Sequence, residues 1–170
     1  MTPGSSTTGG ESPIPEAAPL FGFSLDDRML ALPLEAVVRA LFAVEVTSLP
    51  STPAIIAGIF SYHGMIVPLV DIRVRFGLPR QEILPSDRFI LIRTPKRIVA
   101  VVASSVTGIL KPSGAVIHAG DILIGARYIS GVLPGEDRLI FIYDPDAFLT
   151  PEEETGMETA LAGAAGELVQ

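Results

Sequence analysis

The sequence predicts an all-β protein that contains two copies of one small β unit. An apolar stretch, a polar turn and a second apolar stretch ending in an acid occupy residues 56–71, and a similar segment occupies 129–144. The interval from glycine to the closing aspartate is thirteen residues in both copies, beginning at Gly58 and at Gly131. Turn signals recur about every ten residues without a long 3.6-residue apolar period, which favours small barrels over a doubly wound sheet. A duplicated β unit is therefore expected.

The other strands of the two units also correspond. A strand, a polar turn and a second strand are predicted at 21–32 in the first unit and at 89–102 in the second. A single strand follows in each unit, around residues 37–38 and 106–109. Together with the glycine-to-aspartate hairpin, this gives each unit about five short strands, a number typical of a small barrel.

The strand pattern places one domain at residues 20–150, preceded by a flexible leader at 1–19 that is rich in Pro, Ser, Thr and Gly. Within the domain we expect two tandem subdomains, at about 20–80 and 85–150, joined by a polar linker. The sequence leaves open an arrangement in which the chain ends cross over from one subdomain to the other.

Short helices are predicted at the linker and at the C-terminus. Segment 71–79 begins with an acid that can cap a helix and ends in Gly-Leu-Pro, which can stop one, so we expect one or two turns there. Segment 151–170 begins with a proline and three glutamates after Thr150, which suits the positive end of a helix dipole. Beyond Gly156 the Ala and Gly content predicts a frayed tail.

Composition excludes several classes of function. A net charge of −7 disfavours nucleic acid, whose binding requires clustered Lys and Arg. The absence of cysteine excludes disulfides and thiolate catalysis and fits a cytoplasmic protein. Residues 46–70 carry no formal charge, but proline and glycine interrupt them repeatedly, so we expect no direct membrane insertion.

Enzyme motifs are absent from the sequence. It contains no glycine-rich phosphate loop, no nucleophile elbow and no zinc-binding helix motif. Ser61 and His63 are two residues apart, but no third acid that could orient the histidine is evident. We therefore expect no catalytic residue, no metal site and no cofactor.

Residues 58–73 resemble the signature of the CheW family, which has a glycine, an Asn-Leu-Arg-Gly turn, a Val-Pro strand and Asp-Leu-Arg. Residues 97–110 and 128–131, followed by Asp144, resemble the rest of that domain. The resemblance covers about residues 20–150, and the order and spacing of many motif points coincide.

The resemblance implies two five-stranded SH3-like barrels around a shared core, in an adaptor without catalytic activity. Its implied partners are the cytoplasmic tip of a chemoreceptor and the regulatory domain of a CheA-type histidine kinase. It further implies a cytoplasmic protein that is recruited to membrane receptor arrays. A competing hypothesis is a free-standing β-barrel module that binds a small ligand or a peptide, although the clustered aromatic residues which such a site needs are not evident.

The implied receptor groove lies near a Val-rich strand pair. Its candidate residues are Val37, Val106 and Ile109, for which burial in the core is an equally good interpretation. Gly58 has a structural role at the hairpin and is a candidate for partner contact. Gly64 and Gly131 are expected at structural turns.

Arg39 and His63 depart from the family pattern. Family members generally have an acid at the position of Arg39 and an arginine at the position of His63, and the two are thought to face each other. A guanidinium and an imidazole cannot form a salt bridge. The pair is therefore either drift at a surface contact or a re-specified receptor or kinase interface.

Overall fold

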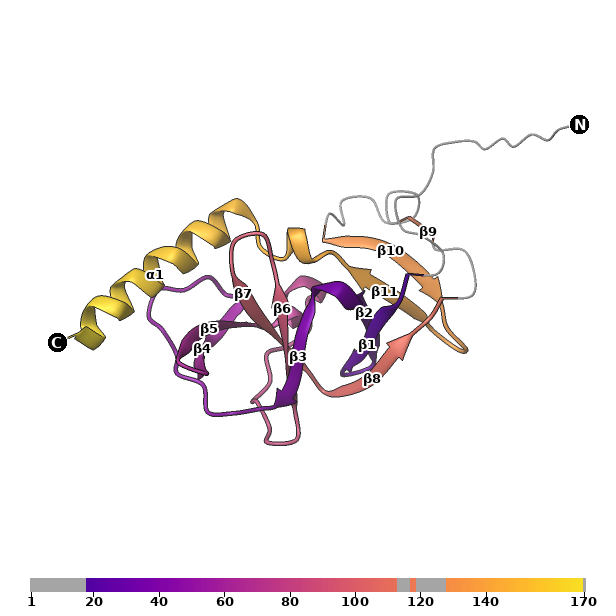
Figure 1. Cartoon of the computed structure of the whole chain (residues 1–170), viewed down its shortest axis with the longest axis horizontal. Helices are drawn as coiled ribbons and strands as arrows, with labels where there is room; N and C mark the ends of the chain where they lie inside the picture. Colours follow the sequence, from indigo (N-terminus) through magenta and orange to yellow (C-terminus); the bar gives the residue numbers. More distant parts are fainter. Residues whose placement is uncertain (1–17, 113–116, 119–127, 170) are drawn as a thin grey trace, which may run out of the picture.

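A computed structural model describes residues 18–112, 117–118 and 128–169 of the chain (Figure 1). The expected leader therefore lies almost wholly outside the described residues. The elements are β1 (Leu20–Leu25), β2 (Arg28–Pro33), η1 (Leu34–Ala36), β3 (Val37–Phe42), β4 (Ile56–Tyr62), β5 (Met65–Val70), η2 (Ile72–Phe76), β6 (Arg88–Arg93), β7 (Ile98–Ala103), β8 (Ser105–Leu110), β9 (Ile117–His118), β10 (Ile129–Pro134), β11 (Leu139–Tyr143), η4 (Pro145–Ala147) and α1 (Pro151–Val169).

Within the described residues, the strands form two sheets with the same internal order. One sheet runs β8-β1-β2-β11-β10-β9 and the other runs β3-β6-β7-β5-β4. In each, a hairpin is flanked by a single strand and by the glycine-to-aspartate hairpin, and one parallel pair, β2 with β11 or β7 with β5, joins the two hairpins. The predicted all-β fold with two small barrels is confirmed.

The two sheets exchange their hairpins between the two sequence units. Hairpin β1–β2 of the first unit pairs with β8 and β11 of the second, and hairpin β6–β7 of the second unit pairs with β3 and β5 of the first. Strands between residues 37 and 103 therefore form one sheet, and the strands on both sides of them form the other. The boundary between sheets thus differs from a simple division near the polar linker, because each hairpin pairs outside its own unit.

The exchanged hairpins place apolar side chains on both faces of the central strands. In β6, Ile90 and Ile92 belong to a core cluster shared with residues of β1 and β2, whereas Phe89 and Leu91 fill the interior of the five-stranded barrel. All four side chains are fully buried. Alternate side chains of one strand therefore enter two different cores, which explains why the sequences of these strands are continuous apolar runs.

The predicted short helix at the linker is confirmed as the 3-10 helix η2, which has five residues. The Asp71 side chain accepts a hydrogen bond from the Arg73 backbone N–H, and Gly77 ends the turn in the left-handed conformation at φ 68°. The Arg73 guanidinium reaches back to Asp26 in the β1–β2 turn at 3.0 Å. Burial would lower the pKa of Arg73, but hydrogen bonding to Asp26 and the charge of Asp71 outweigh burial and raise it. These ion pairs connect the segment that follows β5 in one sheet to the β1–β2 turn of the other.

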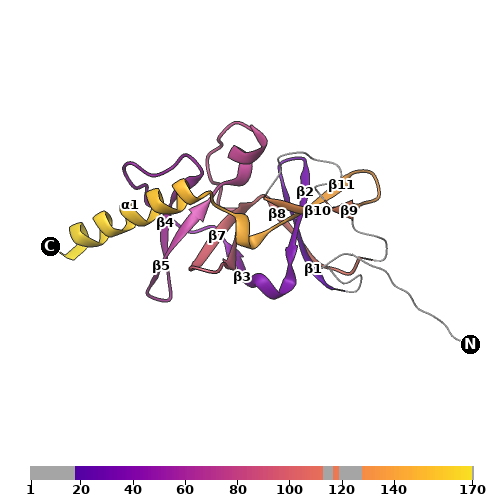
Figure 2. The same ribbon diagram turned by 90° about the horizontal axis from the view of Figure 1, so that it is seen from above.

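The C-terminal helix is longer than predicted. α1 continues beyond Gly156 to Val169, and Figures 1 and 2 place it beside β4 and β5. The predicted fraying beyond Gly156 is wrong, because Met157 is buried in the shared core and Leu161 packs against it. Alanine also has the highest intrinsic helix propensity.

Candidate functional site

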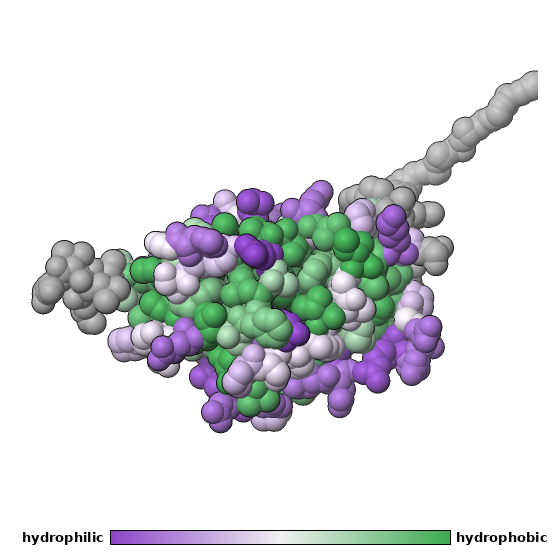
Figure 3. Space-filling view, turned by 60° about the horizontal axis from the view of Figure 1, so that its bottom comes forward, coloured by the Kyte–Doolittle hydropathy of each residue, from purple (hydrophilic) through white to green (hydrophobic). Residues whose placement is uncertain are grey.

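Strands β3 and β8 occupy equivalent edges of the two sheets, β3 beside β6 and β8 beside β1. Figure 3 shows the face that lies at the bottom of Figure 1, where apolar residues cover a continuous area with polar residues around its rim. Among the exposed large apolar side chains, Val38 and Phe42 lie on β3 and Ile109 lies on β8, with exposed fractions of 37%, 63% and 62%. An apolar area of this kind marks an interaction surface.

The predicted groove residues differ in their exposure. Ile109 is at the surface, whereas Val37 and Val106 are half-buried and Val37 packs against the shared core. A β-bulge between Val37 and Arg39 shifts the register with β6, and it leaves Val38 and Arg39 both exposed. Val38 was not among the predicted groove residues, because strict alternation turns it inward when Val37 faces the groove.

Arg39 and His63 both contact the Tyr62 side chain. Arg39 Nη1 donates a hydrogen bond to the Tyr62 hydroxyl at 3.5 Å. The Tyr62 ring meets the His63 ring edge to face, with centroids 4.3 Å apart and planes at 88°. Tyr62 therefore connects the two residues, Arg39 and His63, that depart from the pattern which the sequence resembles. Tyr62, the last residue of β4, was missed, although its position between Ser61 and His63 is visible in the sequence.

The β4–β5 turn that carries His63 has the backbone of a tight two-residue hairpin loop. His63 has φ 51° and Gly64 has φ 78°, the two positive values that a type I′ turn requires. Gly64 lies in open space, so its predicted role in the turn rests on its backbone conformation.

Gly58 lies where the five-stranded barrel closes. Thr47 and Ile59 exchange two backbone hydrogen bonds of 2.8 Å beside it. A Cβ on Gly58 would lie 2.4 Å from Val46 Cγ1 and 2.6 Å from the Thr47 carbonyl oxygen. Gly58 is buried, so the close backbone approach that it allows comes from this chain's own residues. Gly131 lies inside β10 at the equivalent bulge of the other sheet, so its expected place at a turn is wrong.

Phe42 adds a feature that no sequence motif indicated. Its ring is largely exposed, and the Arg88 guanidinium lies over it at 3.9 Å from the centroid. The two residues face each other across β3 and β6. A cation stacked on an exposed ring gives this edge both apolar area and positive charge.

The fold defines a double β-barrel domain of the SH3-like class. A family model described as the CheW-like domain matches residues 19–153, well over half of the chain. The chain therefore belongs to the CheW-like domain family, and the resemblance seen in its motifs is confirmed.

Known proteins similar to this chain carry the same description. The chemotaxis protein CheW of Helicobacter pylori is 27% identical over 78 residues, which is 46% of this chain and 47%, or about half, of that protein. The chemotaxis protein CheW of Rhizobium meliloti is 26% identical over 139 residues, covering 79% of this chain and 88% of that protein. The crystal structure of the scaffolding protein TtCheW from Thermoanaerobacter tengcongensis superposes with a TM-score of 0.71 at 19% identity, over 81% of this chain and 95% of that chain.

Two further findings concern the described residues alone. None of their helices combines the length and the apolar character that crossing a membrane requires. Their His, Asp and Glu side chains form no group of three or more that could hold a metal ion.

Proposed function

We propose that this chain is a non-catalytic adaptor that couples chemoreceptors to a CheA-type histidine kinase. The proposal rests on the CheW-like domain at residues 19–153, since the relatives from Helicobacter pylori and Rhizobium meliloti are named chemotaxis proteins and the solved relative is titled a scaffolding protein. The adaptor works in the cytoplasm and is recruited to receptor arrays at the membrane. The single observation that indicates where a partner binds is the exposed apolar area along β3 and β8.

The receptor tip docks on this apolar area in our proposal. Val38 and Ile109 supply exposed apolar side chains from the two edge strands, and Val37 and Val106 on the same strands are half-buried. Burying exposed apolar surface drives association at about 25 cal/mol per Å². Arg39, His63 and the Tyr62 ring between them tune which partner fits, because charges at a rim govern specificity more than affinity.

The kinase regulatory domain binds through a barrel-to-barrel contact. Transient interfaces of this kind bury on the order of 1,200 Å² and require no cofactor. Calorimetry with the cognate kinase domain tests this part of the proposal, and an absence of binding at ~100 µM would contradict it.

The receptor surface is tested by placing a charge on it. Ile109→Glu is expected to reduce binding to a receptor cytoplasmic fragment at least ~30-fold, because an unpaired charge on a buried interface costs about 2 kcal/mol or more. The side chain of Ile109 is exposed, so circular dichroism is expected to stay unchanged. Val74→Glu is the matched control, because Val74 is an exposed apolar residue on η2. Equal receptor affinity in the wild type and Ile109→Glu contradicts the proposed surface.

A further inference from the structure

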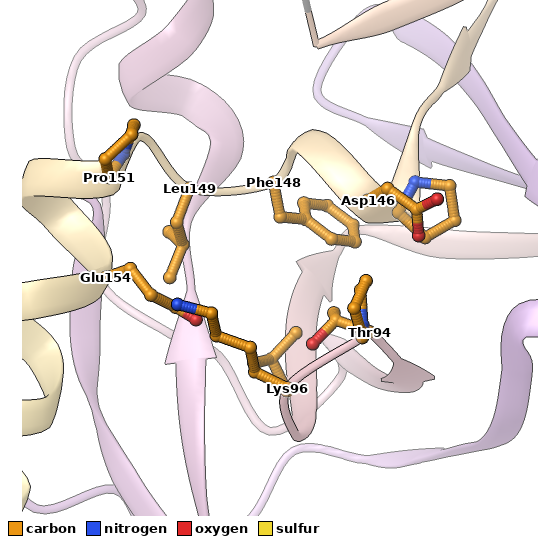
Figure 4. Close-up of a pocket in the computed structure, with 10 residues that line it drawn as sticks. Thr94, Lys96, Asp146, Phe148, Leu149, Pro151 and Glu154 are labelled. Carbon is orange, nitrogen blue, oxygen red and sulfur yellow. The ribbon is translucent and has the colours of Figure 1, made fainter.

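A pocket lies between the β6–β7 turn, η4 and the start of α1 (Figure 4). Its volume is about 210 Å³. These three elements are at the top of Figure 1, whereas the apolar face with β3 and β8 is at the bottom. The pocket is therefore separate from the surface proposed for the chemosensory partners.

The floor of the pocket is apolar and held in place by the core. Val99 and Phe148 line it and are each only 2% exposed, and Leu149 adds a further apolar wall. The Phe148 ring stacks on Tyr143, with centroids 4.6 Å apart and planes at 28°. Three prolines in the lining restrict the backbone around it. The apolar surface is therefore formed before any ligand arrives, which lowers the entropic cost of binding.

The size of the pocket selects the ligand class. Cavities of about 150 Å³ lined by apolar side chains accept a benzene molecule, and sites for drug-sized ligands begin near 300 Å³. At about 210 Å³ this pocket holds one ring with a short substituent. A nucleotide or another multi-ring cofactor does not fit.

The polar part of the pocket favours a cation. Glu154 lines the wall, and its Oε1 is buried without a hydrogen-bond partner among the described residues. Figure 4 shows the Lys96 side chain extending across the pocket toward the Glu154 carboxylate. Within the described part of the chain, Glu154 forms no ion pair with Lys96 or with any other cation. Asp146 adds a second negative charge at the edge.

A cation binds more favourably to a partly dehydrated carboxylate than to a fully hydrated one, because folding has already removed part of the carboxylate's hydration shell. An ammonium group that enters beside an apolar ring can donate to the Glu154 carboxylate while the ring lies against the apolar lining of the pocket. Lys96 competes for the same carboxylate.

We propose that this pocket binds a small aromatic amine, a single ring that carries an ammonium group on a short chain. Phenethylamine is the probe. A free amine and the first residue of a peptide that begins with phenylalanine present the same chemistry, so the tripeptide Phe-Gly-Gly amide is the second probe. Whichever of the two binds more tightly identifies the source.

Titration of the full chain, followed by amide NMR shifts, tests the proposal. Phenethylamine is expected to shift the amides of the β6–β7 turn and the first turn of α1 in a saturable way, and phenylacetate, its anionic counterpart, is expected to bind at least ~10-fold more weakly. Glu154→Gln is expected to weaken phenethylamine at least ~10-fold. Glu152→Gln removes an exposed glutamate from the same helix turn without touching the pocket, so it should leave affinity unchanged.

A variant that is expected to strengthen binding separates a specific effect from a loss of fold, since unfolding can only weaken binding. Lys96→Met removes the competing ammonium from an exposed side chain and is expected to tighten phenethylamine ~3-fold or more. No saturable shift up to ~50 mM with either probe overturns the proposal. Equal affinity for phenethylamine and phenylacetate, or an unchanged affinity in both Glu154→Gln and Lys96→Met, also overturns it. None of these outcomes bears on receptor or kinase binding.

Discussion

Arg75 in η2 holds Glu153 in the first turn of α1 with two hydrogen bonds, of 2.5 and 2.9 Å. Arg75 also donates to the Phe148 carbonyl oxygen at 2.7 Å. Glu153 and Thr150 cap each other, because each side chain accepts a bond from the other's backbone N–H. The start of α1 is therefore fixed at once by its own cap and by the turn that follows β5.

Loss of this ion pair is expected to destabilise the fold. Glu153→Gln should lower the free energy of unfolding by about 1–2 kcal/mol, because the Arg75 and Glu153 side chains are only 12% and 20% exposed and the guanidinium loses its charged partner. Urea unfolding measures the change. Glu152→Gln, at an exposed position in the same turn, should change stability by less than ~0.5 kcal/mol, and an equal effect in both variants would contradict a role for the pair.

The same pair predicts a dependence of stability on pH. Burial alone would raise the pKa of Glu153, but hydrogen bonds from Arg75 and from Thr150 outweigh burial and lower it below the ordinary value of 4.5. A carboxylate whose pKa is lowered in the folded state contributes its full stabilisation above its unfolded pKa. It loses that contribution as the pH falls through its lowered, folded pKa. The stability difference between wild type and Glu153→Gln should therefore be constant above about pH 5.5 and shrink below about pH 4.5. A difference that grows on acidification would be incompatible with this pair.

Two glycine substitutions are expected to act in opposite directions. Gly58→Ala should destabilise the chain by about 2 kcal/mol or more, because its Cβ would meet the Thr47 carbonyl oxygen at 2.6 Å. Gly163→Ala meets nothing within 4 Å in α1 and should stabilise by about 0.5–1 kcal/mol. Thermal unfolding of both variants, compared with wild type, gives the signs. A stable Gly58→Ala would mean that Thr47 does not close the barrel beside it.

A double-mutant cycle tests whether Arg39 and His63 form a re-specified interface. Arg39→Glu together with His63→Arg restores the usual family residues and should change partner preference, because it reverses one rim charge and adds a bidentate donor. His63→Arg alone places two cations beside Tyr62 and should be the less stable single variant. Binding of receptor and kinase fragments to all four proteins gives the coupling. Coupling within ~0.3 kcal/mol and unchanged preference would show drift at a surface pair.

The strands could be predicted from the sequence because each has a local signal. Apolar runs, polar turns and the repeated glycine-to-aspartate interval are properties of neighbouring residues, and they place all four hairpin strands of each unit correctly. The sequence left the exchange of hairpins open, because β2 would find a similar edge in β5 or in β11 and only long-range packing decides between them. α1 was underestimated because Met157 is held by a core that local composition does not reveal.

The candidate surface was predicted in part. Ile109 is exposed as a groove residue should be, but one bulge in β3 determines that Val38 faces out beside Arg39. A bulge depends on the partner strand, so the residues of β3 alone do not predict it. Tyr62 was overlooked for a related reason, because its role arises from an arginine that is distant in sequence.

The exchanged hairpins have a consequence for how the gene can be divided. A chain cut between η2 and β6 leaves the first fragment with hairpin β1–β2 and with β3 and β5, which pair with hairpin β6–β7 of the second fragment. The second fragment keeps β8 and β11, which pair with hairpin β1–β2 of the first. Each fragment therefore carries a complete set of strand types, and two copies of a single ancestral unit could build the same architecture as a swapped homodimer. Fusing the two copies into one chain would have replaced a concentration-dependent assembly with an intramolecular one, after which the two edges, β3 and β8, were free to diverge.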